Sequence, residues 1–176
     1  MKKFIGLFLA IALACFAPGI CLAEVLTHEG AKIEINLPDK WTQAPDGNMM
    51  VVTAPDGDMS IMFMVLEQSE KDKVLEAIDK ALEAKVGEIK WENDGNSKPE
   101  EINGMKGEIW NGTAKEGKFQ VECISLDTPS DKNLGIYWFD TPESEKKYQK
   151  EIDLIVKGLK PMAAAPDAPP AAPPGS

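Results

Sequence analysis

The sequence predicts an α+β fold in which a mostly antiparallel β-sheet is covered by two amphipathic helices. Three observations lead to this prediction. Short runs of alternating apolar and polar residues follow one another with only short turns between them, which is typical of antiparallel strands. Two longer segments have apolar residues at helical spacing. One run is apolar on both faces, so we expect a central strand that is covered on both sides. We expect these elements to form one domain, residues 24–160.

The first expected strand, residues 32–38, alternates isoleucine and leucine with polar residues until Pro38 ends the run. Two further strands follow at residues 48–53 and 58–68. In the last of these, one face carries Met59, Ile61, Phe63 and Val65, and the other carries Met62, Met64 and Leu66.

Residues 69–87 are the first expected helix, because apolar residues recur every three or four positions and lysine and glutamate lie opposite them. Ser69 is placed to cap its start, with Asp72 three residues later, and Gly87 is placed to end it. The expected buried stripe consists of Val74, Ile78, Ala81, Leu82 and Val86.

A second group of strands follows this helix. The turn-forming pair Asn103-Gly104 predicts a hairpin, and residues 115–118 predict the next turn. The expected strands are residues 88–93, the two arms of the hairpin within residues 101–114, residues 118–127 and residues 133–140.

Residues 141–159 are the second expected helix. Thr141 is its cap and Pro142 its first helical residue. Its buried stripe is expected to contain Tyr148, Ile152, Ile155, Val156 and Leu159.

Both ends of the chain are expected to lie outside the folded domain. Residues 1–23 have a basic start, a short apolar run and a small-residue ending, which is the pattern of a secretory signal peptide cleaved after Ala23. The apolar run is short for a membrane span, which needs roughly 20 residues. Lipid attachment at Cys15 is an alternative. Residues 161–176, rich in alanine and proline, are expected to form a disordered tail. We therefore expect an exported protein, periplasmic or secreted, without a transmembrane segment after cleavage.

Charge narrows the range of partners. Removal of residues 1–23 leaves 17 lysines against 29 acidic residues, a net charge of −12, and the chain contains no arginine. Nucleic-acid binding needs a basic surface, and bidentate capture of phosphate or carboxylate needs arginine. The composition therefore argues against nucleic acid. We expect the partner to be a protein or a small ligand of the cell envelope.

Three short motifs resemble those of PsbP-like and DcrB-like exported domains. The first is "INLPDKW" with Leu37, Pro38 and Trp41, the second is "INGMKGEIWNG" with Asn103 and Gly104, and the third is the helix ending "IVKGLK". The resemblance spans roughly residues 25–160 and implies an α/β/α sandwich. It also implies a role in binding and assembly, since relatives include photosystem II extrinsic proteins, bacterial envelope proteins and a Ran-binding nuclear protein. The matching residues are elements of the fold, so no functional residue is transferred from the family.

A calcium site is one candidate for metal binding. The tetrapeptide Ala-Pro-Asp-Gly occurs twice, ten residues apart, and supplies Asp46, Asp56 and nearby Asp58. A compact calcium loop needs more oxygen ligands and a glutamate at a fixed distance, which this stretch lacks. Pro-Asp-Gly is also a favourable turn sequence. We therefore interpret both copies mainly as turns that bracket one strand of a β-meander.

Copper is the second candidate metal. Five of the eight methionines lie within 16 residues, and thioethers are soft ligands that select Cu(I). Met59 is expected on the face opposite Met62 and Met64, and methionine also fills irregular cores, so core packing is the favoured interpretation. The five methionines are Met49, Met50, Met59, Met62 and Met64.

No catalytic constellation is apparent. His28 is the only histidine, and after cleavage Cys123 is the only cysteine. A serine or cysteine nucleophile would therefore have to use His28 as its base, and no nucleophile elbow or phosphate-binding loop is present. Alternation in its expected strand predicts that Cys123 faces the core. We expect no cofactor and no catalytic residue.

The four tryptophans are large side chains of the kind that often anchor partners, but burial beneath the two helices is the favoured interpretation. They are Trp41, Trp91, Trp110 and Trp138. The sequence as a whole favours an exported, non-enzymatic binding or assembly module of the bacterial cell envelope. The alternative is a periplasmic metal-handling protein that uses Met49–Met64 or the three aspartates.

Overall fold

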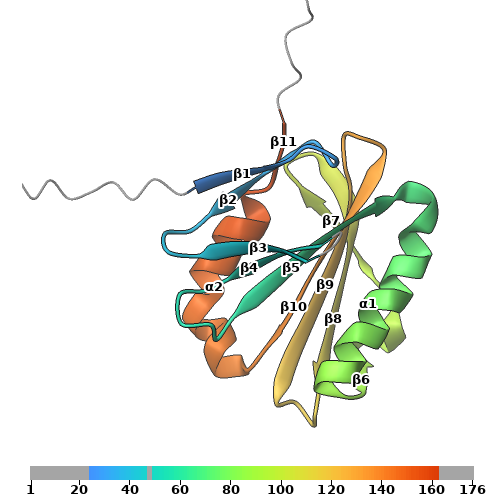
Figure 1. Ribbon diagram of the computed structural model, residues 1–176. Coiled ribbons are helices and arrows are strands. Elements are labelled where there is room, and N and C mark those ends of the chain that lie inside the picture. Colours follow the sequence, from blue (N-terminus) through green and yellow to red (C-terminus); the bar gives the residue numbers. More distant parts are fainter. Residues whose placement is uncertain (1–23, 47–48, 163–176) are drawn as a thin grey trace, which may run out of the picture.

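The computed structural model describes residues 24–46 and 49–162 (Figure 1). The expected signal peptide with its cleavage point at Ala23, the alternative anchor at Cys15 and most of the expected tail lie outside these residues. The folded part extends past residue 160, the expected end of the domain. The Met162 amide donates a hydrogen bond to the Lys32 carbonyl at 2.8 Å, which ties this segment to the small sheet.

Eight strands form the main sheet in the order β3-β4-β5-β10-β9-β8-β6, with β7 also paired to β8, and every pairing is antiparallel. Three further strands form a small antiparallel sheet in the order β1-β2-β11. The main-sheet strands are β3 (Thr42–Asp46), β4 (Met49–Thr53), β5 (Ser60–Glu67), β6 (Ile89–Trp91), β7 (Lys98–Ile102), β8 (Met105–Ala114), β9 (Phe119–Asp127) and β10 (Lys132–Asp140). The small sheet contains β1 (Glu24–His28), β2 (Ile33–Leu37) and β11 (Lys160–Pro161).

Two helices complete the α+β fold, α1 (Lys71–Val86) and α2 (Pro142–Lys157). Short 3₁₀ turns occupy Gln68–Glu70 (η1) and Glu92–Gly95 (η2). The expected order of strands, helix, strands and helix is therefore confirmed.

Strand β5 has apolar side chains on both faces, as expected. It lies between β4 and β10 in the main sheet. Ile61 and Phe63 belong to one buried cluster, which also contains Met59, whereas Met62 belongs to a second cluster. Because successive side chains of a strand point to opposite faces, the two clusters lie on opposite sides of the sheet.

Helix α2 and the small sheet pack into the first cluster. Ile33, Ile35 and Leu37 of β2 are almost completely buried there. The buried residues of α2 are those that its spacing predicts, namely Tyr148, Ile152, Ile155 and Val156, and Leu159 follows them. The Thr141 hydroxyl accepts a hydrogen bond from the Ser144 amide at 3.2 Å, so Thr141 is the N-cap and Pro142 opens the helix, as expected.

Helix α1 packs into the second cluster through Ile78, Leu82 and Val86. Two expectations for this helix are wrong. Ala81 is exposed rather than buried, and Ser69 lies within the 3₁₀ turn that leads into the helix rather than at its cap. The side chain of Val74, which was also expected in the stripe, is outside the described part. Gly87 has φ +82° and its amide bonds to the Glu83 carbonyl at 2.8 Å, so it ends the helix as predicted.

The two Ala-Pro-Asp-Gly copies differ. In the second, the Gly57 amide donates to the Ala54 carbonyl at 2.9 Å and Gly57 has φ +79°, which confirms a turn between β4 and β5. In the first, Pro45 and Asp46 belong to strand β3 and pair with Met50 and Met49. Strand β3 was missed because its sequence is polar and contains proline, but it is an edge strand, where proline is tolerated.

Candidate ligand-binding site

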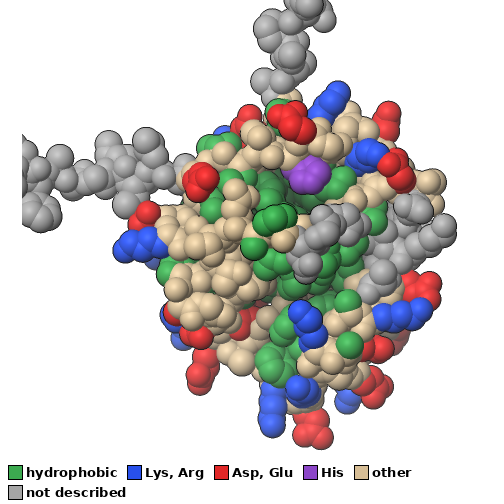
Figure 2. All heavy atoms as spheres, viewed as in Figure 1, with side chains coloured by type: hydrophobic (Ala, Val, Ile, Leu, Met, Phe, Trp, Pro, Cys, Tyr) green, Lys and Arg blue, Asp and Glu red, His purple; other side chains and the backbone are tan. Residues whose placement is uncertain are grey.

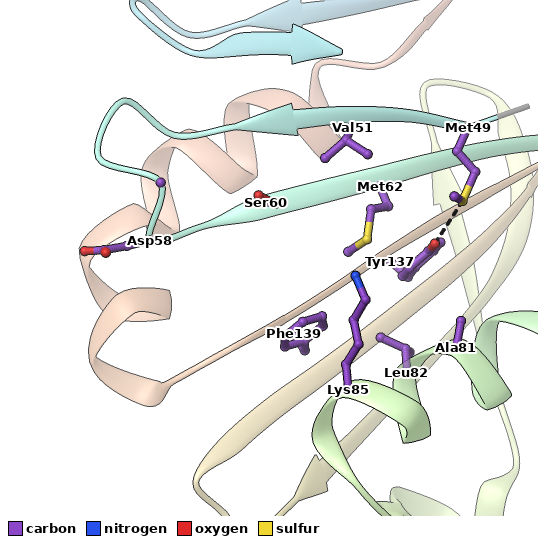
Figure 3. Close-up of a pocket in the computed structure, with 11 residues that line it drawn as sticks. Met49, Val51, Asp58, Ser60, Met62, Ala81, Leu82, Lys85, Tyr137 and Phe139 are labelled. Atoms are coloured by element: carbon purple, nitrogen blue, oxygen red, sulfur yellow. Dashed lines mark hydrogen bonds between the residues drawn. The ribbon is translucent and has the colours of Figure 1, made fainter. Parts of the chain in front are cut away.

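A cavity of about 470 Å³ lies between the C-terminal half of α1 and strands β4, β5 and β10 (Figure 3). Figure 2 shows hydrophobic side chains gathered on this face between the strands and the helix, with charged side chains mainly around the rim. We call this space the methionine cavity. Its lining comprises Met49, Val51, Gly57, Asp58, Ser60, Met62, Ala81, Leu82, Lys85, Tyr137 and Phe139.

Strand register places the apolar lining on one face. Val51 of β4 and Tyr137 of β10 are the partners of Met62 of β5 on either side. Directly paired residues in antiparallel strands project from the same face, so these three side chains form one row across the sheet. Phe139 follows Tyr137 by two positions and therefore projects the same way.

A polar contact joins two residues of this lining. The Tyr137 hydroxyl lies 3.2 Å from the Met49 sulfur and donates to it (Figure 3). Tyr137 is 4% exposed, and a buried phenol is stabilised when its hydroxyl finds an acceptor. This contact fixes two of the cavity walls relative to each other.

Lys85 brings a positive charge to an otherwise largely apolar lining. It lies in the last turn of α1, where a cation interacts favourably with the helix dipole. In Figure 3 its side chain extends from the helix toward Met62. The carboxylate of Asp58, the other charged group of the lining, points away from these residues and contacts Lys147 at 3.3 Å.

The sequence-predicted calcium ligands are already paired with lysine. Asp56 and Asp58 lie in the turn between β4 and β5, and Lys147 of α2 forms an ion pair with both carboxylates. The hydrogen bond from Lys147, supported by one from Tyr148, holds the pKa of Asp56 well below its usual range. The side chain of Asp46 is outside the described residues. Within the part of the chain that is described, no group of three or more His, Cys, Asp or Glu side chains is placed to hold a metal ion.

The methionines divide as strand alternation predicts. Met59 is buried in the first cluster, on the α2 side of the sheet. Met62 lies on the α1 side, accompanied by the half-buried Met64 and Met49. Met49 and Met64 are direct partners in the pairing of β4 with β5, and Met62 precedes Met64 by two positions, so the three side chains project from the same face of the sheet.

Cys123 and His28 take no part in the methionine cavity. Cys123 is buried on the α1 side of the sheet, and burial, with a further contribution from the charges of Asp79 and Glu122, raises its pKa to about 12. Its thiol is therefore protonated and unreactive at neutral pH. His28 lies at the end of β1, where its Nδ1 accepts a hydrogen bond from the Ala31 amide at 3.1 Å.

Sequence reasoning did not identify the cavity itself. The alternation of Tyr137, Trp138 and Phe139 indicated two faces, and the structure buries Trp138 in the first cluster with the other two on the opposite side. The sequence could not predict that β4, β5 and β10 lie side by side, because this depends on the order of strands in the sheet. The sequence did not identify Lys85 as a lining residue, because a lysine in the last turn of a helix is typical of a solvated surface.

In residues 24–46 and 49–162, no helix is long and apolar enough to cross a bilayer.

Comparisons with known proteins establish the fold. No family model matches the sequence, and no curated protein sequence matches it. Solved structures do match. The solution structure of cyanobacterial PsbP (CyanoP) from Synechocystis aligns with a TM-score of 0.58 at 12% identity, over 83% of this chain and 96% of that one.

Two further structures align less closely. LpqN, described as involved in cell envelope biogenesis of Mycobacterium tuberculosis, aligns with a TM-score of 0.50 at 14% identity, over 78% of this chain and 88% of that one. A protein from Bacteroides thetaiotaomicron aligns with a TM-score of 0.50 at 13% identity, over 83% of this chain and 50% of that one. The chain therefore has a PsbP-like fold, as the sequence motifs implied.

Proposed function

We propose that this chain is an exported, non-enzymatic binding module of the bacterial cell envelope, and that it holds a small apolar or amphiphilic ligand in the methionine cavity. The observation that carries the ligand site is the cavity itself. It measures about 470 Å³ and is lined mainly by methionine, aromatic and aliphatic side chains. Small-molecule sites are typically concave, mostly apolar and about 300–1,000 Å³ in volume, with few polar groups.

Two observations support the envelope. Residues 1–23 carry the pattern of a secretory signal peptide. The fold is shared with an envelope-biogenesis protein and with a PsbP protein, although identities of 12–14% show fold rather than function. The two buried clusters, one with α1 and one with α2, also favour the α/β/α layering of PsbP-like domains.

The compartment can be tested by fractionation. The full chain, expressed with a C-terminal tag in a Gram-negative host, should be recovered in the periplasmic fraction with residues 1–23 removed. Intact protein in the cytoplasm would contradict export, and lipid-modified protein in the membrane fraction would favour the Cys15 anchor.

The ligand site can be tested with N-phenyl-1-naphthylamine, a neutral apolar probe whose fluorescence rises in apolar surroundings. The wild-type protein should bind the probe, and Val51→Trp should reduce its affinity at least tenfold, because the larger ring fills the cavity. Val25→Trp is the matched control, since Val25 is 52% exposed on β1. The proposed site would be contradicted if Val51→Trp and Val25→Trp lost affinity for the probe equally, or if the wild type did not bind the probe.

A second candidate function is periplasmic handling of Cu(I), which the shared face of Met49, Met62 and Met64 favours. Titration with Cu(I) under reducing conditions should then raise the melting temperature, and Met62→Leu/Met64→Leu should abolish the rise. Met59→Leu is the control, because Met59 lies on the opposite side of the sheet. An identical rise in melting temperature for the wild type, Met62→Leu/Met64→Leu and Met59→Leu would exclude this site.

A further inference from the structure

A second cavity, of about 340 Å³, lies between α1 and strands β6, β8 and β9. It is on the same side of the sheet as the methionine cavity, but the described linings of the two have no residue in common. We call it the indole pocket. Its walls include Trp91, Trp110, Glu76 and Asp79, with the buried Ile78 and Cys123 beneath them.

Two tryptophans on adjacent strands supply the aromatic surface. Trp91 of β6 is the direct partner of Gly112 of β8, and Trp110 precedes Gly112 by two positions, so both indoles project from the same face. The Trp91 ring occupies the space above Gly112, where a Cβ atom would lie 2.9 Å from ring atom Cε3. Both indoles therefore face α1 across the pocket.

The four tryptophans differ in their surroundings. Trp41 and Trp138 are 6% and 4% exposed and belong to the core beneath α2. Trp91 and Trp110 are half-buried and line the indole pocket, so their ring surfaces are available to a ligand.

Helix α1 brings negative charge to these rings. The Trp91 indole N–H donates to Asp79 Oδ1 at 3.2 Å, which fixes the carboxylate beside the ring. The charge of Asp79 reaches the base of the pocket, where it contributes, after burial, to the raised pKa of Cys123. Glu76, one turn earlier, adds a second carboxylate and pairs with the exposed Lys80 at 2.6 Å. The described lining contains no lysine.

We propose that the indole pocket binds a small organic cation of the methylated or quaternary ammonium type. The faces of aromatic rings attract cations, and the attraction is greatest for indole. A methylated ammonium group has an apolar surface that suits the two rings and the cavity floor, and a charge that suits Asp79. A bare metal ion is a poorer fit, since it would need more oxygen, nitrogen or sulfur ligands than two carboxylates supply.

The test compares choline with 3,3-dimethylbutan-1-ol, a neutral molecule of nearly the same shape in which carbon replaces the nitrogen. Binding to the full protein is measured by isothermal titration and by tryptophan fluorescence. Choline should bind at least tenfold more tightly than the neutral alcohol. Equal affinities, or no binding of choline, would overturn the proposal.

Variants locate the binding. Trp110→Leu should reduce choline affinity at least tenfold, whereas Trp110→Phe should retain part of it because a ring face remains. Asp79→Asn should remove most of the preference for choline over the alcohol, and Glu83→Gln, an equal change of charge at an exposed position of the same helix, should not. If Trp110→Leu fails to fold, Trp110→Phe and Asp79→Asn still test whether choline binds in the indole pocket. The proposed site would be overturned if Trp110→Phe and Asp79→Asn both bound choline as tightly as the wild type. It would also be overturned if Glu83→Gln lost as much of the preference for choline as Asp79→Asn.

Discussion

Single residues hold this fold together at points that are far apart in the sequence. The Asn103 amide Nδ2 donates to the carbonyls of Lys157 and Leu159 at 2.8 and 2.6 Å. The Asn36 amide donates to the Gly158 carbonyl at 3.1 Å. The last carbonyl groups of a helix have no partner within the helix, so these two side chains supply partners at the C-terminus of α2. This gives the asparagines of the "INLP" and "INGM" motifs a shared physical role.

Asn103 can be tested directly, because it also has φ +49° in the turn between β7 and β8. Asn103→Gly keeps this backbone conformation and removes the two hydrogen bonds, so we expect a loss of about 1–2 kcal/mol in the free energy of unfolding. Asn103→Ala adds the cost of a left-handed residue and should lose about 2–3 kcal/mol. Urea unfolding measures both. A glycine variant as stable as the wild type would contradict the role of the amide.

Glu122 introduces a pH dependence at the residue scale. It is half-buried on β9, and burial, followed by the charges of Glu145, Asp153 and Glu100, raises its pKa to about 7. The usual pKa is 4.5. Between about pH 4.5 and 7, Glu122 is therefore protonated in the folded protein but ionised in the unfolded chain. Stability linked to this group is therefore complete below about pH 4.5 and is lost as the pH rises through 7.

Glu122→Gln removes this ionisation. We expect the variant to be more stable than the wild type at pH 8, by about 1–3 kcal/mol, and to differ little at pH 4.5. Urea unfolding at both pH values measures the difference. Glu101→Gln, at an exposed position of β7, is the control and should show no such pH-dependent gain. A gain of equal size at both pH values would mean that packing, not ionisation, is responsible.

At the scale of elements, periodicity predicted both helices and most strands, and it failed where a strand buries few side chains or none. Strands β1, β3 and β11 were missed, because β1 buries only Leu26, β3 is a polar edge strand that contains Pro45, and β11 has only two residues. The faces of β5 and β10 were predictable, since alternation alone assigns them. The two cavities were not, because the order of strands in the sheet decides which faces meet. No local pattern encodes that order or the approach of Lys147 to Asp56 and Asp58.

The pairing of β8 with β9 depends on one glycine. A Cβ atom at Gly107 would lie 1.9 Å from the Ser125 carbonyl oxygen, so the two backbones must separate if a side chain is added. We expect Gly107→Ala to cost more than about 3 kcal/mol, or to prevent folding. Gly117→Ala is the comparison, because Gly117 has φ +86° with no atom within 4 Å of the added Cβ. It should cost only about 1–2 kcal/mol. Thermal unfolding of both variants measures the contrast, and equal losses would contradict the steric argument.

At the scale of the whole molecule, the charge of the chain after residue 23 opposes its compact state. It carries 17 lysines and 29 acidic residues, so like charges repel across the surface. Salt screens this repulsion, and it also weakens the exposed ion pairs such as Lys147 with Asp58. Exposed pairs contribute only about 0–1 kcal/mol each, so we expect relief of the net repulsion to be the larger effect.

The melting temperature of the chain from residue 24 should therefore rise between 10 and 300 mM NaCl. A gain of about 1 kcal/mol corresponds to a rise of about 2–4 °C for a domain of this size. Glu29→Lys, at an exposed turn position, reduces the net charge by two and should melt above the wild type at low salt. That difference should shrink at 300 mM NaCl, because the repulsion it relieves is already screened. A fall in the melting temperature with salt would mean that specific ion pairs, not net repulsion, dominate the electrostatics of this fold.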